Sequence, residues 1–223
     1  MVRAICFDLD GTLARYGGGF RSFVGLLRHE LLLESDLDRV AQLLQEEIAR
    51  DGPLTLASAL TRTLGRLEQR PPPDLPELVR SAVRAYAADV RPTEGAGELL
   101  ARLHARGVPL ALVSNGPVDI QRASLASLGF ERFFRVVLIS GDADVAARKP
   151  AARIFSLACA GLESLPAETL MVGDTPEGDV AGARAFGMQA VLVGDVAEGE
   201  RLGVPVAADL RAVDVLLRER FAL

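Results

Sequence analysis

Near its N-terminus the chain reads Ala4-Ile5-Cys6-Phe7-Asp8-Leu9-Asp10-Gly11-Thr12-Leu13, and this stretch decides the fold. Its apolar part, residues 4–7, is too short for a core helix and is followed by a glycine turn, which predicts a buried strand. In a fully extended strand, the spacing of Asp8 and Asp10 places both carboxylates on one face. Their repulsion at the buried end of a sheet must be offset by a cation or a proton. A turn-forming Asp10 and a solvated Asp8 are the alternative interpretation.

The rest of the chain divides into a helical block and an alternating block. After a glycine-rich joint at 14–19, residues 20–90 show only helical patterns, in which apolar residues recur at i, i+3, i+4 and i+7. Gly52-Pro53 and Pro71–Pro73 interrupt this block, which predicts a four-helix insertion. From Arg91 onward, short apolar strands alternate with amphipathic helices. The sequence therefore predicts an α/β fold with a doubly wound parallel sheet.

Composition and charge argue against several classes of function. The chain has 223 residues, of which 49% are hydrophobic and 25% charged, so it can bury a core. Its net charge of −5 and the lack of a basic block argue against nucleic acid or an anionic membrane surface as partner. No apolar run approaches the roughly 18 residues of a membrane span, and the N-terminal residues predict no signal peptide. We expect a cytoplasmic protein in which Cys6 and Cys159 are core residues.

Polar side chains follow three of the predicted strands. Asp8 and Asp10 end the first strand, Ser114 and Asn115 end the second, and Asp174 ends a later one. Ligands of open parallel sheets bind beyond the carboxyl ends of the strands. The only lysine of the chain, Lys149, lies on a loop at the same edge, and Asp179 begins a helix that faces the same point. We therefore expect these groups to meet in one site.

This combination of groups is suited to phosphoryl transfer. A phosphoryl group needs a cation, a lysine and directed hydrogen-bond donors. Mg²⁺ prefers oxygen ligands with few protein carboxylates, which Asp8 and Asp174 supply. Asp8 and Asp10 can divide the work of nucleophile and general acid–base. Lys149 provides a compact positive charge.

Phosphate oxygens need donors in addition to charge. Ser114 offers a hydroxyl, and the backbone N–H groups of Asn115 and Gly116 lie at a predicted helix start, where anions bind readily. Asn115 is the only asparagine of the chain, and Lys149 is its only lysine. A residue type that occurs at a single position beside other reactive residues favours a role in the chemistry of the site.

Four short motifs occur in the same order as those of a known superfamily. They are Phe7–Leu13, Val113–Gly116, Lys149-Pro150 and Val172–Asp179. On these residues, the chain resembles phosphohydrolases of the haloacid dehalogenase superfamily, in particular phosphoglycolate phosphatase-like members with a helical cap after the first motif. The resemblance implies a sheet ordered 5-4-1-2-3, an α/β core at 1–14 and 91–223, and a cap domain at 15–90.

The resemblance also implies roles for individual residues. Asp8 attacks phosphorus to form an aspartyl-phosphate, and Asp10 protonates the leaving group and then activates water. Dehalogenases of the superfamily lack this second acid, so Asp10 favours phosphate chemistry. Lys149 is expected to be catalytic. The expected metal ligands are Asp8, Asp10, Asp174 and Asp179, and the expected phosphate-binding residues are Thr12, Ser114, Asn115, Gly116 and Lys149.

The candidate substrate contacts are Tyr16, Phe20 and Arg21, because a closing cap would swing the glycine joint over Asp8. The predicted function is that of a Mg²⁺-dependent phosphomonoesterase acting on a small phosphorylated metabolite. A phosphomutase of the same superfamily is an alternative that sequence does not separate from it. A receiver-type phospho-acceptor signalling module also combines acids, a hydroxyl and a lysine on such a sheet, but has no use for a helical insertion.

Overall fold

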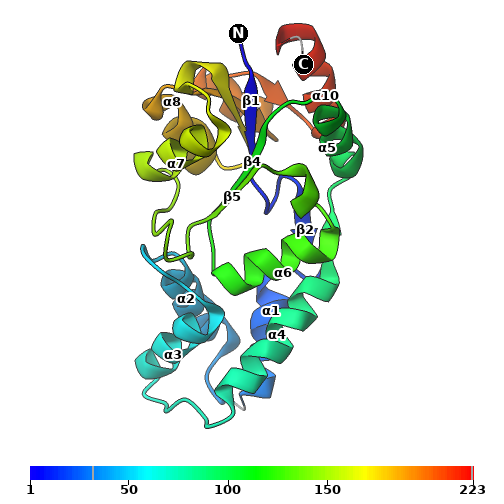
Figure 1. Ribbon diagram of the computed structural model, residues 1–223. Coiled ribbons are helices and arrows are strands. Elements are labelled where there is room, and N and C mark those ends of the chain that lie inside the picture. Colours follow the sequence, from blue (N-terminus) through cyan, green and yellow to red (C-terminus); the bar gives the residue numbers. More distant parts are fainter. Residues whose placement is uncertain (32, 222) are drawn as a thin grey trace.

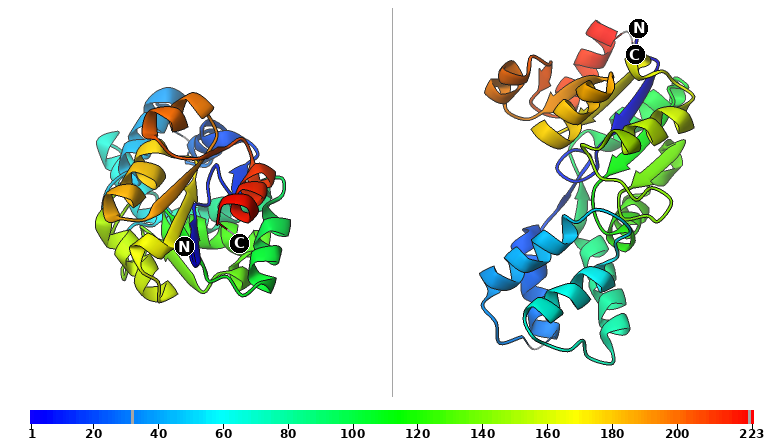
Figure 2. Two further views of the ribbon diagram at one scale, coloured as in Figure 1. Left: turned by 90° about the horizontal axis from the view of Figure 1, so that it is seen from above. Right: turned by 90° about the vertical axis from the view of Figure 1, so that its left-hand side faces the viewer.

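The chain folds into two lobes, one built around a sheet and one built from helices (Figures 1 and 2). The computed structural model describes residues 1–31, 33–221 and 223. The chain leaves the sheet lobe shortly after its first strand, forms the helical lobe, and then returns to complete the sheet. Both termini lie at the end of the sheet lobe that faces away from the helical lobe (Figure 2).

In the described part of the chain, six parallel strands form the main sheet, in the order β5-β4-β1-β6-β7-β8. They are β1 (Ala4–Phe7), β4 (Leu110–Ser114), β5 (Val136–Ile139), β6 (Thr169–Gly173), β7 (Gln189–Val193) and β8 (Val206–Ala207). In the register of the central strand, Cys6 lies between Ala111 and Met171. Numbered along the chain, the first five strands have the predicted order 5-4-1-2-3, and β8 is an additional edge strand. The α/β prediction is confirmed.

Helices cover both faces of this sheet. Ile5 and Phe7 of β1 belong to an apolar cluster with α5 and α10, whereas Ala4 and Cys6 belong to a cluster with α7 and α8. This alternation explains why all four residues of β1 are buried. The helices and turns of this lobe are α5 (Ala96–Ala105), α6 (Val118–Leu128), α7 (Ala152–Leu162), α8 (Gly182–Phe186), α9 (Val196–Leu202), α10 (Leu210–Phe221), and the 3₁₀ turns Glu131–Phe133 and Pro166–Glu168.

The helical lobe has an apolar core of its own. Its helices are α1 (Gly19–Glu30), α2 (Leu37–Ile48), α3 (Leu56–Arg66) and α4 (Leu75–Asp89). Asp36 accepts hydrogen bonds from the backbone N–H groups of Asp38 and Arg39 and so starts α2. Thr55 and Ser58 form a reciprocal capping box at the start of α3. The four-helix insertion therefore forms as the periodicity predicts. None of the described helices has the length and apolarity needed to cross a bilayer.

A two-stranded ribbon joins the lobes where the sequence predicted a flexible joint. Strand β2 (Ala14–Tyr16) pairs antiparallel with β3 (Val90–Pro92), so the outgoing and returning segments run side by side. The joint prediction was wrong for 14–16, because strands of three residues beside glycines and a proline have too few positions to show a period of two. The ribbon fixes the direction in which the helical lobe leaves the sheet.

A second set of contacts, away from the ribbon, also joins the two lobes. Leu54, just before α3, donates its backbone N–H to the Gly141 carbonyl (2.8 Å) and accepts from the Val118 N–H (2.9 Å). The Asp119 carboxylate accepts from the Leu56 N–H (3.0 Å). Helix α6 of the sheet lobe also packs against α4 of the helical lobe (Figure 1). The space between the lobes is therefore bounded by the ribbon on one side and by these contacts on the other.

Candidate functional site

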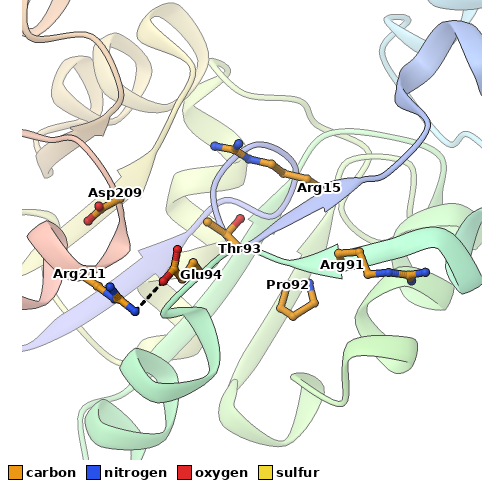
Figure 3. Close-up of a pocket in the computed structure, with 7 residues that line it drawn as sticks. All are labelled: Arg15, Arg91, Pro92, Thr93, Glu94, Asp209 and Arg211. Atoms are coloured by element: carbon orange, nitrogen blue, oxygen red, sulfur yellow. Dashed lines mark ion pairs between the residues drawn. The ribbon is translucent and has the colours of Figure 1, made fainter.

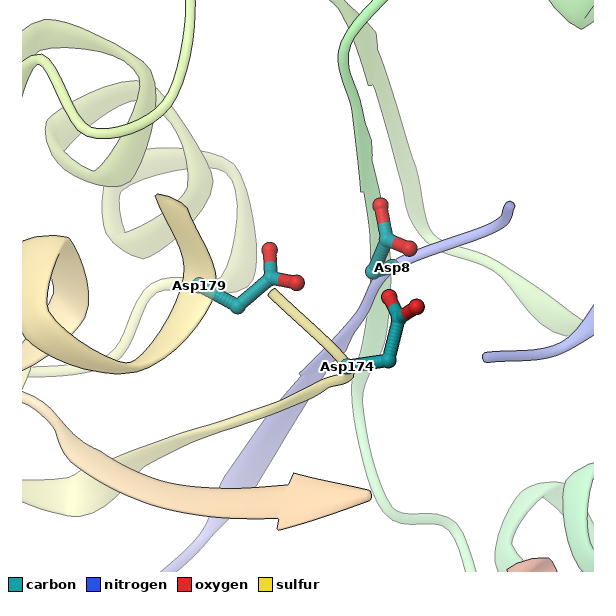
Figure 4. Close-up of side chains that lie close together, drawn as sticks. All are labelled: Asp8, Asp174 and Asp179. Atoms are coloured by element: carbon teal, nitrogen blue, oxygen red, sulfur yellow. The ribbon is translucent and has the colours of Figure 1, made fainter. Parts of the chain in front are cut away.

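Three aspartates from distant parts of the chain meet beyond the ends of two neighbouring strands. Asp8 follows β1, Asp174 follows β6, and Asp179 lies in the π-helical turn Pro176–Ala181. Each offers a carboxylate oxygen within 4.8 Å of the other two. Figure 4 shows Asp179 approaching from its helical turn while Asp8 and Asp174 come from adjacent strand ends. The sequence predicted that Asp179 begins a helix, whereas the structure places it in a wider π turn that precedes α8.

Glycines make this close approach possible. Gly11 has φ +85°, and a Cβ built there would lie 2.7 Å from Asp174 Cγ, so any other residue would displace this carboxylate. Gly173 similarly leaves room for Asp179, whose Cβ would lie 2.6 Å from a Cβ built at position 173. The small residues in the first and fourth motifs are therefore needed for the three carboxylates to gather.

Lys149 lies among these carboxylates and is itself only 6% exposed. Its Nζ donates hydrogen bonds to Asp8 Oδ1 (2.5 Å) and to the Val113 carbonyl (2.7 Å). Asp179 Oδ1 lies 2.6 Å from the same nitrogen, an ion pair without hydrogen-bond geometry. One ammonium group is thus shared by two buried carboxylates.

The pKa shifts reflect an excess of buried negative charge. Burial raises the pKa of Asp8 to about 8, although the Lys149 ammonium acts in the opposite direction. Burial also raises the pKa of Asp174, and the nearby Asp179 carboxylate adds to this shift. Burial lowers the pKa of Lys149, but Asp8 and Asp179 outweigh it, and the net shift is upward. The lysine therefore stays charged and balances only part of the negative charge around it.

This donor set fits a divalent cation with a preference for oxygen. Three carboxylates within 4.8 Å of one another, with one ammonium among them, leave negative charge that a cation would neutralise. Mg²⁺ takes oxygen ligands and is usually held by one or two carboxylates with water and substrate oxygens completing its shell. Asp8, Asp174 and Asp179 supply oxygen ligands of this kind. Asp10, which the sequence prediction included among the ligands, is not part of this group of three.

Asp10 instead makes a contact of its own. Its Oδ2 accepts a hydrogen bond from Gln121 Nε2 (2.6 Å), a residue of α6 in the sheet lobe. Strand β1 ends at Phe7, so the alternation of an extended strand, on which the shared-face prediction rests, does not extend to residues 8–10. Solvent reaches Asp10, but desolvation by the surrounding protein still raises the pKa of its carboxyl. The hydrogen bond from Gln121 acts in the opposite direction.

The predicted phosphate-binding residues lie around the cluster but differ in what they contact. The Ser114 hydroxyl is buried with no hydrogen-bond partner among the described residues, and so has its hydrogen-bonding capacity free. The Asn115 amide exchanges two hydrogen bonds with the backbone of Lys149 (2.9 and 3.0 Å) and thereby holds the lysine in place. The Gly116 N–H donates to Ser140 Oγ (3.0 Å), and the Thr12 hydroxyl donates to Asp174 (3.3 Å).

The predicted substrate contacts divide between the site and the surface. Tyr16 lines an open cleft of about 560 Å³ together with Asp10 and Asp174. Phe20 lines a smaller cavity of about 150 Å³ that also includes Asp10. Arg21 lines neither, and pairs with Asp38 on the exposed surface of the helical lobe.

Two residues beside the site were missed by the sequence interpretation. Gln121 binds Asp10, and Tyr86 of α4 stacks on Tyr16 with ring centroids 4.3 Å apart. Gln121 is 3% exposed and follows buried Ile120 in α6. A polar glutamine on the buried side of a predicted helix was the sequence signal that could have identified it. Tyr86 had no such signal, because an aromatic residue on an amphipathic helix is expected in the core.

A further cavity, of about 330 Å³, lies beside the ribbon rather than at the carboxylates. Arg15 and Thr93 line it, and Glu94 pairs with Arg211 across 2.6 Å (Figure 3). No predicted site residue lines it. Asp10, Tyr16 and Asp174 line the cleft between the lobes instead.

Comparison with known proteins places the chain in a family. The family model for haloacid dehalogenase-like hydrolases matches residues 2–187. A phosphoserine phosphatase of Thermus thermophilus is 40% identical over 149 residues, which are 66% of this chain and 57% of that protein. The chain thus matches little more than half the length of that relative. A phosphoglycolate phosphatase of Salmonella typhi is 31% identical over 206 residues, covering 85% of this chain and 80% of that protein.

The fold is also similar to that of a solved structure. A phosphatase of the same superfamily from Thermococcus onnurineus superposes with a TM-score of 0.65 and 25% identity, over 97% of this chain and 98% of that one. The superfamily resemblance drawn from four motifs is confirmed by these comparisons.

Proposed function

The chain belongs to the haloacid dehalogenase-like hydrolase family, and we propose that it is a Mg²⁺-dependent phosphomonoesterase acting on a small phosphorylated metabolite. The observation that supports this most directly is the environment of Asp8. Asp8 is 5% exposed, and its carboxylate is held by Lys149 and lies beside two further carboxylates. A second acid, Asp10, remains available at the edge of the cleft. The phosphatase names of the relatives support the same class of reaction.

The proposed reaction has two steps, and both steps use Asp8 and Asp10. In the first, an oxygen of Asp8 forms a bond to phosphorus while the bond from phosphorus to the leaving oxygen breaks, and Asp10 gives that oxygen its proton. In the second, Asp10 takes a proton from water as the water oxygen attacks phosphorus. The bond to Asp8 then breaks and inorganic phosphate leaves. Asp10 thus returns to its protonated state for the next cycle.

Other residues of the chain prepare Asp8 for this role. Lys149 orients its carboxylate and provides positive charge close to the transferring group. Asn115 fixes the backbone of Lys149, and the free Ser114 hydroxyl offers a donor or acceptor to phosphate oxygens. Asp8, Asp174 and Asp179 would hold Mg²⁺, with Asp179 also pairing Lys149. When bound, the ion neutralises charge on the phosphoryl oxygens and on the carboxylates.

We also propose that residues 15–90 act as a cap domain over a core formed by 1–14 and 91–223. The β2–β3 ribbon is the covalent connection, and Tyr16 at its end lines the cleft with Asp10. Substrates would enter between the lobes and reach Asp8 from the cap side.

The test is hydrolysis of phenyl phosphate by the purified protein, with and without Mg²⁺. Asp8→Asn and Asp10→Asn should each reduce turnover by orders of magnitude, because each removes a step of the reaction rather than a contact. Asp142→Asn breaks a partly exposed ion pair with Arg122 and, as the control, should retain activity. The covalent route is wrong if Asp8→Asn hydrolyses the ester at a near-normal rate. A radiolabelled phosphoprotein that persists for many minutes would instead identify a phospho-acceptor module.

A further inference from the structure

The smaller cavity beside Asp10 indicates what kind of leaving group the site takes. It lies between the lobes and has a volume of about 150 Å³. Most of its wall is apolar, with Phe20, Phe23 and Ile48 from the helical lobe and Ile120 from the sheet lobe. An apolar cavity of roughly this volume accepts a benzene-sized molecule. The leaving group of an ester bound at Asp8 and protonated by Asp10 would occupy this space.

Charge in the cavity is one-sided. Among its described lining residues, Asp10 is the only one that carries a charge near neutral pH, and none is arginine, lysine or histidine. A carboxylate on the leaving group would therefore enter an apolar space without a counter-ion and would face Asp10. Burying an unpaired charge in such a place is strongly unfavourable.

Gln121 adds a polar requirement of the opposite kind. It lines the cavity and is 3% exposed, and its Nε2 is used by Asp10. Its Oε1 is buried with no hydrogen-bond partner in the described part of the chain. An amide oxygen of this kind accepts a hydrogen bond, so it is satisfied by a hydroxyl or N–H group and repels a carboxylate.

The walls of the cavity are held in place by the contacts between the lobes. Leu54 bonds to Gly141 and Val118 through its backbone, and Arg148 donates to the Ile48 carbonyl (2.9 Å). Phe23 packs edge-on against Tyr86, with ring centroids 4.9 Å apart. The cavity is therefore shaped before a substrate arrives, which allows it to select one.

From these contacts, and given the phosphomonoesterase activity proposed above, we infer that the substrate's leaving group is uncharged and largely apolar, carries one hydrogen-bond donor, and has no carboxylate. This distinguishes the chain from relatives whose names indicate phosphoserine and phosphoglycolate, which both carry a carboxylate. The selection comes from the cavity walls and Gln121, and not from the aspartates that carry out the reaction.

An isosteric pair of esters tests the inference on the unmodified protein. 2-Phosphoglycolate and its amide differ only in the replacement of a carboxylate by a neutral group with N–H donors. The Mg²⁺-loaded protein should hydrolyse the amide, and also phenyl phosphate, with kcat/KM at least about tenfold above that of phosphoglycolate. Calorimetric titration of the same pair into Asp8→Asn, which cannot form the covalent intermediate, should give the same order of affinity.

A pair of variants on α1 locates the selection. Phe20→Arg places a cation at the cavity wall and should reduce the preference for the amide by about tenfold. Leu26→Arg makes the same change on the same helix, at a position that is similarly exposed (36% against 37%) but does not line the cavity. Leu26→Arg should therefore leave the preference unchanged.

The outcomes separate this inference from the proposed function. If phosphoglycolate is hydrolysed as well as its amide or better, the inference is wrong and the phosphatase proposal stands. If Phe20→Arg changes the preference no more than Leu26→Arg does, the leaving group does not bind in this cavity. If no ester is hydrolysed, the proposed function fails and the inference falls with it. Should Phe20→Arg not fold, the ester pair and the calorimetry still decide the matter.

Discussion

Replacing Lys149 with methionine should destabilise the protein by about 3–5 kcal/mol in the absence of divalent cations. Methionine is close to lysine in length and lacks its charge, so the change removes the ammonium and leaves the packing largely intact. Two carboxylates then lose their partner, and neither side chain is more than 7% exposed. Water cannot replace the lysine at such burial, and each carboxylate must remain unpaired or take up a proton.

The expected change in melting temperature follows from the chain length. For 223 residues, 1 kcal/mol corresponds to about 2–4 °C, so the midpoint should fall by roughly 6–20 °C. Addition of Mg²⁺ should recover part of this loss, because a divalent ion on the three carboxylates replaces the missing positive charge.

Thermal unfolding followed by circular dichroism at pH 7, in EDTA and then in excess Mg²⁺, measures both effects. The control is Arg201→Met, which breaks an exposed ion pair with Glu198 and should leave the midpoint almost unchanged. The double variant Lys149→Met/Asp179→Asn should be less destabilised than the two single changes added together, with a coupling of about 0.5–3 kcal/mol. A midpoint for Lys149→Met within about 2 °C of the wild-type value would refute the reasoning, since that change is less than about 1 kcal/mol.

Three further changes test other parts of the structure. Gln121→Leu removes a hydrogen bond to the Asp10 carboxylate worth about 1.5–3 kcal/mol, so kcat should fall roughly 10- to 100-fold. The same change raises the pKa of Asp10, so the part of the pH–rate profile that reports this carboxyl should move to higher pH. An unchanged pH–rate profile would contradict this. Glu47→Gln should cost about 1–3 kcal/mol at pH 7, whereas exposed Glu46→Gln should change little. Burial raises the pKa of Glu47, but the arginines around it outweigh burial and lower the pKa below its ordinary 4.5. The stability that Glu47 contributes is therefore lost as pH falls, and the melting temperatures of Glu47→Gln and the wild type should converge in acid. A difference in melting temperature that stays constant down to pH 3 would be the wrong result. Gly11→Ala should weaken Mg²⁺ binding measured by calorimetry, because the new Cβ displaces the Asp174 carboxylate. The control is Gly19→Ala, with φ +69° and nothing within 4 Å of its Cβ, which should cost only about 1–2 kcal/mol of backbone strain. Equal Mg²⁺ affinities of the two variants would contradict the prediction for Gly11.

Much of the fold was determined by short-range patterns in the sequence. Four-residue apolar runs such as β1, alternating with amphipathic helices, were sufficient for a parallel sheet, and the helical periodicity of 20–90 was sufficient for the insertion. The four motifs identified the family and, through it, the strand order. These features succeed because a strand covered on both faces is apolar throughout and a helix with one buried face has a period of 3.6, independently of the other segments.

The contacts inside the site were decided only by the tertiary structure. Lys149 and Asp8 are 141 residues apart in the chain, and no local pattern states that the ammonium is shared with Asp179 and not with Asp10. The separation of Asp10 from the cluster depends on where β1 ends and on how α6 brings Gln121 to it. Likewise, the cavity exists only where side chains of α1 and α6 face each other across the two lobes. Sequence periodicity specifies which face of an element is buried, whereas packing between elements determines which side chains meet there.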